Sequence, residues 1–380
     1  MYFVAIVLFL SALSFYELGK NRSCHEVLYL FVLLVMTLLL CFRFGQGTDY
    51  YAYYNQFLQE IDSVDSYLHQ TLSHSEWGWY VLMLTTKKLG LPFEFLVAVV
   101  SLLMMFSLYQ ALKMSPYKMT SLLLFFPTYY MTYCFSGLRQ GLAVCIFLGF
   151  GVRLLLERKY WKYVLLILMT GLLHTASLIL LFLPIALIVK EKHLNVLLVL
   201  AFLGAVVLSK LPIVKALSFV GSRAMYVEDA SFSIGAIMIR AVLFFIIWRL
   251  HHLGAPLNTK LYQEEDNLFK LYYAGFIVFI FLSAFGILSQ RLTVPMKAME
   301  ILLIPLLLYR NRERLLNRKR TRFSEMALYM IVVIMMMNAE CVKNVNSYID
   351  QRDYHDVTLA NYPYISIFDE ERVWQTTYSF

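Results

Sequence analysis

Long apolar stretches run along almost the whole of this chain, and short polar segments separate each stretch from the next. A helix needs about 20 predominantly apolar residues to cross a lipid bilayer. The pattern therefore predicts an all-α, polytopic membrane protein with about twelve transmembrane helices. The predicted helices cover residues 1–16, 27–42, 93–112, 119–135, 138–156, 162–173, 175–189, 193–209, 232–250, 269–289, 294–309 and 325–343.

Two parts of this pattern need interpretation. The N-terminal stretch, MYFVAIVLFLSALSFY, has no basic region and no small-residue cleavage site, so we expect a retained helix and not a signal peptide. Residues 162–173 and 175–189 are each shorter than a full span, and His174 separates them. We expect two short or bent helices that meet near His174.

The long loop at residues 43–92 has a pattern of its own. It predicts a turn, then an aromatic-rich helical piece, then an amphipathic helix from Glu76 to Leu89 that lies along the membrane interface. Its Tyr and Trp side chains suit that depth.

Composition agrees with a membrane protein. The 380 residues are 60% hydrophobic and 15% charged, whereas soluble domains are about 45–50% apolar and about 25% charged. No part is long and polar enough for a sizeable soluble domain, so residues 1–380 form one integral membrane domain. The five cysteines have no metal-ligand spacing, and neither a disulfide framework nor a metal site is predicted.

The net charge of +8 carries information about topology. Lys and Arg gather in short connections, including a basic loop at 310–324. Moving such residues across the membrane is unfavourable. These connections are therefore predicted to be cytoplasmic, with membrane lipids and not nucleic acid as their partners. The opposite, extracytoplasmic side receives 43–92, 210–231, the turn around Arg291 and the tail 344–380, so both termini lie outside.

Four arginines fall at the predicted outer helix ends: Arg43, Arg139, Arg223 and Arg291. A guanidinium group binds phosphate oxygens bidentately, although an interfacial arginine can also simply reach lipid headgroups. Arg139 stands out because Gly137, Gly141, Cys145 and Gly149 form a stripe of small residues along its helix. Such a stripe favours close helix packing, which would hold Arg139 inside the bundle.

Three further residues are candidates for proton transfer. Asp49 lies in the turn RFGQGTDY, where it serves as a general base, as an arginine partner or only as part of a helix-starting turn. Glu76 starts the amphipathic helix, where an acidic residue also suits the helix dipole. His174 is an imidazole in an apolar hairpin, which is either functional or satisfied by a nearby hydroxyl group.

Arg240 and Glu300 lie near the centres of their predicted helices. Opposite charges at that depth usually pair with each other, so we expect a structural ion pair and not a proton relay.

An ordered set of short motifs gives a resemblance that spans nearly the whole chain. The motifs are RFGQGTDY, Glu76 with WGWY, RQGLAVCIFLGF, LLHTASLILLFLP, SRAMY, QRLTV and a closing YPY. Together they resemble the EpsG-like family of bacterial polysaccharide polymerases, of the Wzy type. Pro295 and Met296 depart from the aromatic pair expected after Arg291.

The resemblance implies a multi-pass enzyme of the bacterial inner membrane that makes O-antigen, capsule or exopolysaccharide. Such an enzyme joins oligosaccharide repeat units carried on undecaprenyl pyrophosphate, and it adds the growing chain to the non-reducing end of the next unit. A protein that regulates chain length is a candidate partner. Motif positions carry over to Arg43, Gly45, Gly47, Asp49, Tyr50, Glu76, Arg139, Gln140, His174, Arg223 and Arg291.

The residue types agree with that chemistry. Pyrophosphate is a good leaving group, so orientation, charge neutralisation and removal of one proton suffice. We assign the four arginines to pyrophosphate, and Gln140, Tyr50 and Tyr226 to positioning of the glycan or loop. No acidic motif at the outer face suggests a cation, so metal and cofactor independence is expected. His174 is the first choice of base, before Asp49 and Glu76, since it should stay neutral and accept a proton.

Two other functions remain open. A membrane-embedded, lipid-phosphate-dependent glycosyltransferase would use a carboxylate in its first outer loop, where Asp49 lies. A flippase of lipid-linked glycans would need a cationic cavity that reaches both faces, whereas the candidate residues gather at the outer face.

The predicted topology can be tested by cysteine labelling. Because 43–92 contains no Lys or Arg between Arg43 and Lys87, we expect it outside. A Ser66→Cys variant should then react with an impermeant maleimide in intact spheroplasts, above the level of the unmodified chain. A Lys162→Cys variant, in a predicted cytoplasmic connection, is the control. Labelling of Ser66→Cys only after lysis contradicts the topology.

Overall fold

The structure is a computed structural model that describes residues 2–45, 48–69, 75–209, 234–253, 260–317, 364–369 and 371. Over these residues the chain is helical, apart from turns and one isolated bridge between Arg43 and Ser366. This confirms the all-α prediction. The predicted loop 210–231 and helix 325–343 lie outside the described residues, as do Gly47, Arg223 and Tyr226.

The N-terminal half contains α1 (Tyr2–Lys20), α2 (Glu26–Cys41), α3 (Thr48–Gln59), the 3₁₀-helix η1 (Asp65–His69), α4 (Trp77–Lys88), α5 (Phe93–Leu112), α6 (Lys118–Phe125), the π-helix η2 (Phe126–Cys134) and α7 (Leu138–Ile146). The rest contains the π-helix η3 (Phe147–Gly151), α8 (Val152–Leu156), α9 (Tyr160–Leu173), the 3₁₀-helix η4 (Thr175–Leu187), α10 (Glu191–Leu208), α13 (Ile234–Leu253), α14 (Lys260–Phe281), α15 (Gly286–Ala298) and α16 (Glu300–Asn317).

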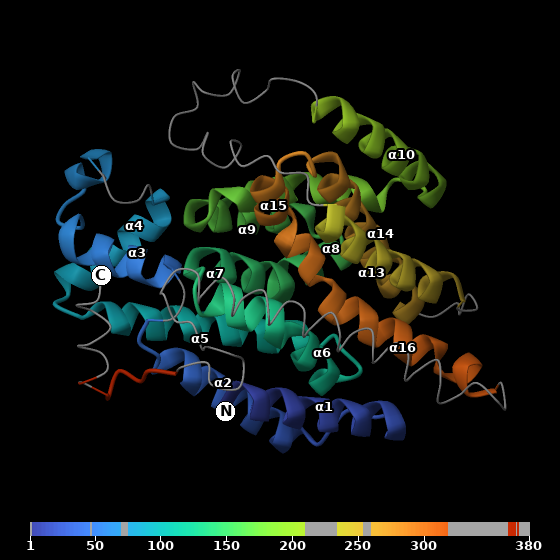
Figure 1. The fold of residues 1–380 in the computed structure, drawn as a ribbon, viewed down its shortest axis with the longest axis horizontal. Coiled ribbons are helices and arrows are strands. Elements are labelled where there is room, and N and C mark those ends of the chain that lie inside the picture. Colours follow the sequence, from blue (N-terminus) through green and yellow to red (C-terminus); the bar gives the residue numbers. More distant parts are fainter. Residues whose placement is uncertain are drawn as a thin grey trace.

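Four of the described helical stretches are long and apolar enough to cross a membrane: Tyr2–Lys20, Phe93–Leu112, Leu138–Leu156 and Glu191–Leu208. A fifth candidate is the pair Leu288–Ala298 and Glu300–Asn311, which is bent by 40°. Figure 1 shows α10 at the edge of the bundle, where most of its apolar side chains are exposed and suited to lipid contact. The count of twelve spans stays a prediction.

Several local predictions are confirmed. α9 ends at Leu173 and η4 begins at Thr175, so two short helices meet at His174, whose extended backbone makes the break. The loop 43–92 contains an aromatic-rich helix, α3, and a second helix, α4, that starts after Glu76. A Cβ atom at Gly141 or Gly149 would lie 2.5 Å or 2.2 Å from a backbone oxygen, which confirms close packing along the small-residue stripe.

Other helix boundaries differ from the prediction. The stretch 119–135 is α6 followed by a π-helix, because Pro127 has no N–H group for the regular α-helical pattern. The predicted helices 269–289 and 294–309 become three: α14 ends at Phe281, α15 starts at Gly286, and α16 starts after a bend at Met299.

The tail residues 364–369 meet the chain just after α2. The backbone N–H of Phe44 donates to Ile365 over 2.8 Å, and that of Ile367 donates to Phe42 over 2.9 Å. The tail residues 364–369 therefore lie at the same end of the bundle as the start of the loop 43–92. This agrees with the predicted placement of both on one side, whereas the identity of that side stays a prediction.

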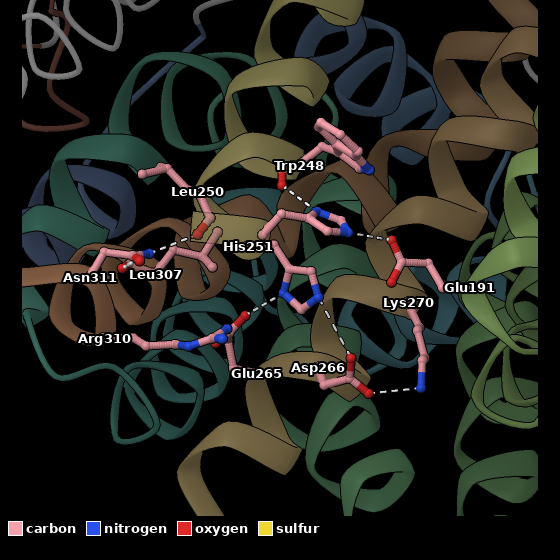
Figure 2. A network of polar contacts seen from close by, with 11 residues as sticks. Glu191, Trp248, Leu250, His251, Glu265, Asp266, Lys270, Leu307, Arg310 and Asn311 are labelled. Carbon is pink, nitrogen blue, oxygen red and sulfur yellow. Dashed lines mark hydrogen bonds and ion pairs between the residues drawn. The ribbon is translucent and has the colours of Figure 1, made fainter. Parts of the chain in front are cut away.

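A charge network with a buried centre joins α10, α13, α14 and α16 (Figure 2), at the end of the bundle opposite α3 and α4 (Figure 1). Glu265 on α14 contacts Arg310 on α16, and His251 Nδ1 on α13 lies 2.6 Å from Glu265 Oε1. The second nitrogen of His251 faces Asp266 at 3.6 Å, while His252 binds Glu191 of α10 at 2.9 Å. These contacts hold the four helices together.

Removal of the central carboxylate should destabilise the fold. The side chains of Glu265, Arg310 and His251 are 1%, 6% and 6% exposed, so Glu265→Ala leaves the buried guanidinium group of Arg310 and the ring of His251 without their shared carboxylate. Loss of one partner of a buried ion pair costs about 3–5 kcal/mol. We expect a clearly lower melting temperature in detergent for Glu265→Ala, while Gln263→Ala, exposed on the same helix, should melt like the wild type. Equal melting of both variants contradicts this role.

Candidate functional site

A polar cluster forms where four separate segments of the chain meet at the end of the bundle that carries α3 and α4 (Figure 1). α3 contributes Tyr53, and Glu76 comes from the residue before α4. Arg139 comes from the first turn of α7, and His174 and Thr175 come from the junction of α9 and η4. The structure thus brings together three of the residues that the sequence singled out.

Arg139 and Glu76 form the central ion pair of this cluster. Arg139 Nη1 donates to Glu76 Oε2, and the two side chains are 17% and 15% exposed. Arg139 Nε donates to the hydroxyl oxygen of Tyr53 over 3.1 Å, and the guanidinium group lies 5.0 Å from the centre of the Tyr53 ring. Burial raises the pKa of Tyr53 to about 12, so Tyr53 is a neutral partner of Arg139.

The second carboxylate oxygen of Glu76 faces the junction of α9 and η4. It accepts hydrogen bonds from the backbone N–H of Thr175 at 3.0 Å and from the Thr175 hydroxyl at 3.2 Å. His174 Nδ1 lies 3.6 Å from the same oxygen. Among the described residues, neither ring nitrogen of His174 has a hydrogen-bond partner, which is unusual for a buried imidazole.

The environment of Glu76 keeps it ionised. Burial alone raises the pKa of Glu76, but its interactions with His174, Arg139 and the Thr175 N–H together outweigh burial and lower the pKa to about 2. A carboxylate with so low a pKa is a weak proton acceptor at neutral pH. Among the three candidates for the base, this argues against Glu76 and leaves His174 and Asp49.

Asp49 and Tyr50 lie at the start of α3. The backbone N–H of Asp49 donates to the Ser136 hydroxyl over 3.4 Å, and the carboxylate lies near Gly137 at the start of α7. Asp49 is thus beside the cluster. Tyr50 is fully buried, with its ring 5.8 Å from that of Phe44 and 5.5 Å from that of Phe93. This position suits the fixing of the loop and not contact with a glycan.

Arg43 occupies a different environment from the one expected. Its side chain is completely buried, and its guanidinium group donates to the backbone oxygens of Leu40, Cys134 and Phe135 at 2.6–3.2 Å. These carbonyl groups lie at the end of α2 and the end of η2. Arg43 therefore ties two helix ends together, and we infer a structural role for it in place of pyrophosphate binding.

Gln140 connects the cluster to α15. Its amide nitrogen donates to the backbone oxygen of Arg291 over 2.9 Å, which holds α15 against the first turn of α7. The Arg291 side chain is partly exposed. Two of the four predicted arginines, Arg139 and Arg291, are thus brought to one region, whereas Arg223 and Tyr226 lie outside the described residues.

Arg240 and Glu300 each have a neutral partner deeper in the bundle. Arg240 Nη1 donates to the Thr293 hydroxyl over 2.9 Å and its guanidinium group stacks on Phe279. Tyr129 donates its hydroxyl to Glu300 over 3.1 Å. The direct ion pair stays a prediction.

Sequence reasoning missed Tyr53 and Thr175. Tyr53 is one of four tyrosines in the run DYYAYYN, and no feature of that run marks the one that meets Arg139. Thr175 follows His174 directly, so its part in holding Glu76 could have been suspected. In the part of the chain that the structure describes, no group of three His, Cys, Asp or Glu residues could hold a metal ion.

Comparison with known proteins gives one match. The model of the EpsG family matches residues 26–349, which include every residue of the cluster. No curated protein and no solved structure matches the chain.

The low pKa of Glu76 predicts an acid-sensitive contribution to stability. A carboxylate whose pKa is about 2 in the folded state and 4.5 in the reference state stabilises the fold above pH 4.5 and loses that effect as pH falls towards 2. The contribution is on the order of 3 kcal/mol. Wild type should therefore melt well above Glu76→Gln at pH 6, and the difference should shrink between pH 4.5 and 2. A difference that is constant over that range contradicts the assignment.

Proposed function

The chain belongs to the EpsG family, and we propose that it is a polymerase of lipid-linked oligosaccharide repeat units. Membership of this family makes it a membrane protein of polysaccharide biosynthesis. The proposal adds the substrate, undecaprenyl-pyrophosphate-linked oligosaccharide, and the reaction, transfer of the growing chain to the non-reducing end of the next unit at the outer face.

One observation carries the proposal: an arginine for an anion and an imidazole for a proton lie on the two sides of Glu76. Arg139 uses Nε and Nη1 for Tyr53 and Glu76, and no described residue binds its Nη2. His174 Nδ1 faces Glu76 Oε1 at 3.6 Å, and Nε2 has no hydrogen-bond partner among the described residues. Unsatisfied groups of this kind suit a bound pyrophosphate and a sugar hydroxyl group.

The reaction requires little covalent chemistry from the protein. The acceptor hydroxyl oxygen attacks the anomeric carbon of the donor, and the bond between that carbon and the pyrophosphate oxygen breaks. His174 takes the proton of the hydroxyl group and passes it to water, while Arg139 and Arg291 neutralise the charge on the departing pyrophosphate. The products are the lengthened glycan on its lipid and undecaprenyl pyrophosphate.

The charge network at the opposite end of the bundle favours an enzyme over a flippase. A flippase needs a path that opens to both faces, whereas the network of Glu265, His251 and His252 ties four helices together (Figure 2) at the end opposite α3 and α4 (Figure 1). Asp49, beside the cluster, keeps a single-sugar glycosyltransferase as the second candidate, and the two enzymes differ in their product.

Arginine substitutions should reduce polymer formation by the purified protein. Loss of a hydrogen bond between a charged group and an anion costs about 1.5–3 kcal/mol, or roughly 10-fold to 100-fold in turnover. We expect this loss for Arg139→Ala and Arg291→Ala with purified lipid-linked repeat unit, and a partial loss for Arg139→Lys. Lys162→Ala, exposed on α9, is the matched control.

The readout is glycan length on gels, at equal protein level and equal melting temperature. Full polymer from Arg139→Ala contradicts the assigned role of Arg139. If the wild type transfers one sugar only, the protein is a single-sugar glycosyltransferase and not a polymerase.

A further inference from the structure

We propose that Glu76 is a positioning residue that holds the anion-binding Arg139 and the proton-accepting His174 in one rigid unit, with Tyr53 as the support for Arg139. The inference rests on the proposed function and deepens it, since it assigns a task to a carboxylate that does not itself touch substrate. It also assigns a task to Tyr53, which no motif marks.

The two oxygens of Glu76 have separate partners. Oε2 accepts from Arg139 Nη1, and Oε1 accepts from the backbone and hydroxyl groups of Thr175. The Thr175 contacts fix Oε1 beside the ring of His174, 3.6 Å from Nδ1. One carboxylate thus sets the distance between residues that lie on α7 and at the junction of α9 and η4.

The position of Glu76 in its own helix supports this role. Glu76 is the N-cap of α4, and a side chain there usually accepts a hydrogen bond from the first turn of the helix. The Glu76 side chain makes no such bond. Its carboxylate points away from α4 and towards α7 and η4, so the local stabilisation of a capped helix is replaced by contacts between distant segments.

A carboxylate next to Nδ1 also selects the form of the imidazole. Ionised Glu76 can only accept hydrogen bonds, so a neutral His174 places its proton on Nδ1 and keeps a lone pair on Nε2. Nε2 then accepts the proton of the sugar hydroxyl group, and Glu76 stabilises the resulting imidazolium ion. Nε2 is buried, and no hydrogen bond from the described residues occupies it, so its acceptor capacity is left for a bound hydroxyl group.

Tyr53 supports the other side of the unit. Its hydroxyl oxygen accepts from Arg139 Nε at 3.1 Å, and its buried ring lies under the guanidinium group and against Trp79, 5.4 Å away. With Nε and Nη1 both held, the direction of Nη2 is fixed. Tyr53 therefore serves the binding of the anion and has no contact with His174 among the interactions that the structure describes.

The two sides of the unit predict different kinetic effects. Tyr53→Phe keeps the ring and loses only the hydroxyl, so it should lower kcat/KM for the lipid-linked donor about 3-fold to 10-fold through Arg139 alone, less than Arg139→Ala does. Glu76→Gln frees both Arg139 and His174, so kcat should fall about 10-fold to 100-fold while KM also rises. Glu76→Asp keeps the charge and should recover part of kcat.

A double-mutant cycle separates positioning from a general structural role. If Glu76 acts on kcat in part through His174, Glu76→Gln should lower kcat by a smaller factor in the His174→Gln background than in the wild type. Independent effects on kcat, which multiply in the double variant, overturn the inference. So does a normal kcat for Glu76→Gln. If Glu76→Gln does not fold, Glu76→Asp at normal melting temperature replaces it in the same cycle.

The design also distinguishes this inference from the proposed function. The wild type is assayed first with purified undecaprenyl-pyrophosphate-linked repeat unit. If the folded wild type forms no polymer from this substrate, the proposed function is overturned. Polymer from both wild type and Glu76→Gln, at equal kcat, overturns only the role of Glu76.

Discussion

The cost of placing charge inside a membrane bundle is the constraint on which this structure depends. An ionised side chain away from water must have a partner, or several kcal/mol are lost. Glu17 meets this requirement by accepting the backbone N–H groups of Met119 and Thr120 at the start of α6. Arg43 meets it with backbone carbonyl groups, and Glu265 meets it with Arg310 and His251. Each of these contacts joins segments that are far apart in sequence.

The cluster around Glu76 follows the same constraint but is incompletely satisfied. Both carboxylate oxygens of Glu76 accept hydrogen bonds, whereas the imidazole of His174 makes none among the described residues. Arg139 uses Nε and Nη1, and no described residue binds its Nη2. Ion pairs therefore hold helices together near Glu265, whereas the ion pair of Arg139 and Glu76 lies beside an imidazole that makes no hydrogen bond in the described part of the chain. The assignment of chemistry to the α3 and α4 end rests on the types of residue that meet there, an arginine, a carboxylate and an imidazole.

The sequence predicted most of the described helices and the break at His174, because hydrophobic runs and turn residues are local signals. It also singled out Arg139, Glu76 and His174 as isolated polar residues, and the structure brings these three together. Partners were not predictable in the same way. The π-helices η2 and η3 change the number of residues per turn. The α-helical period therefore no longer predicts on which face of its helix Tyr129 or Gly149 lies. The contacts of Arg43 with the end of η2 could not be predicted, because nothing in its own segment shows that η2 ends beside it. The network of Glu265 could not be predicted from the sequence either, since it depends on how four helices pack.

The most direct test of the polymerase account is the glycan composition of a strain from which this chain has been deleted. The account predicts surface glycan of a single repeat unit, with complete lipid-linked units accumulating at the outer face, and long chains restored by the wild-type chain. Repeat units trapped on the cytoplasmic side would show a flippase. Units that lack one sugar would show a single-sugar glycosyltransferase, and either result would contradict the account.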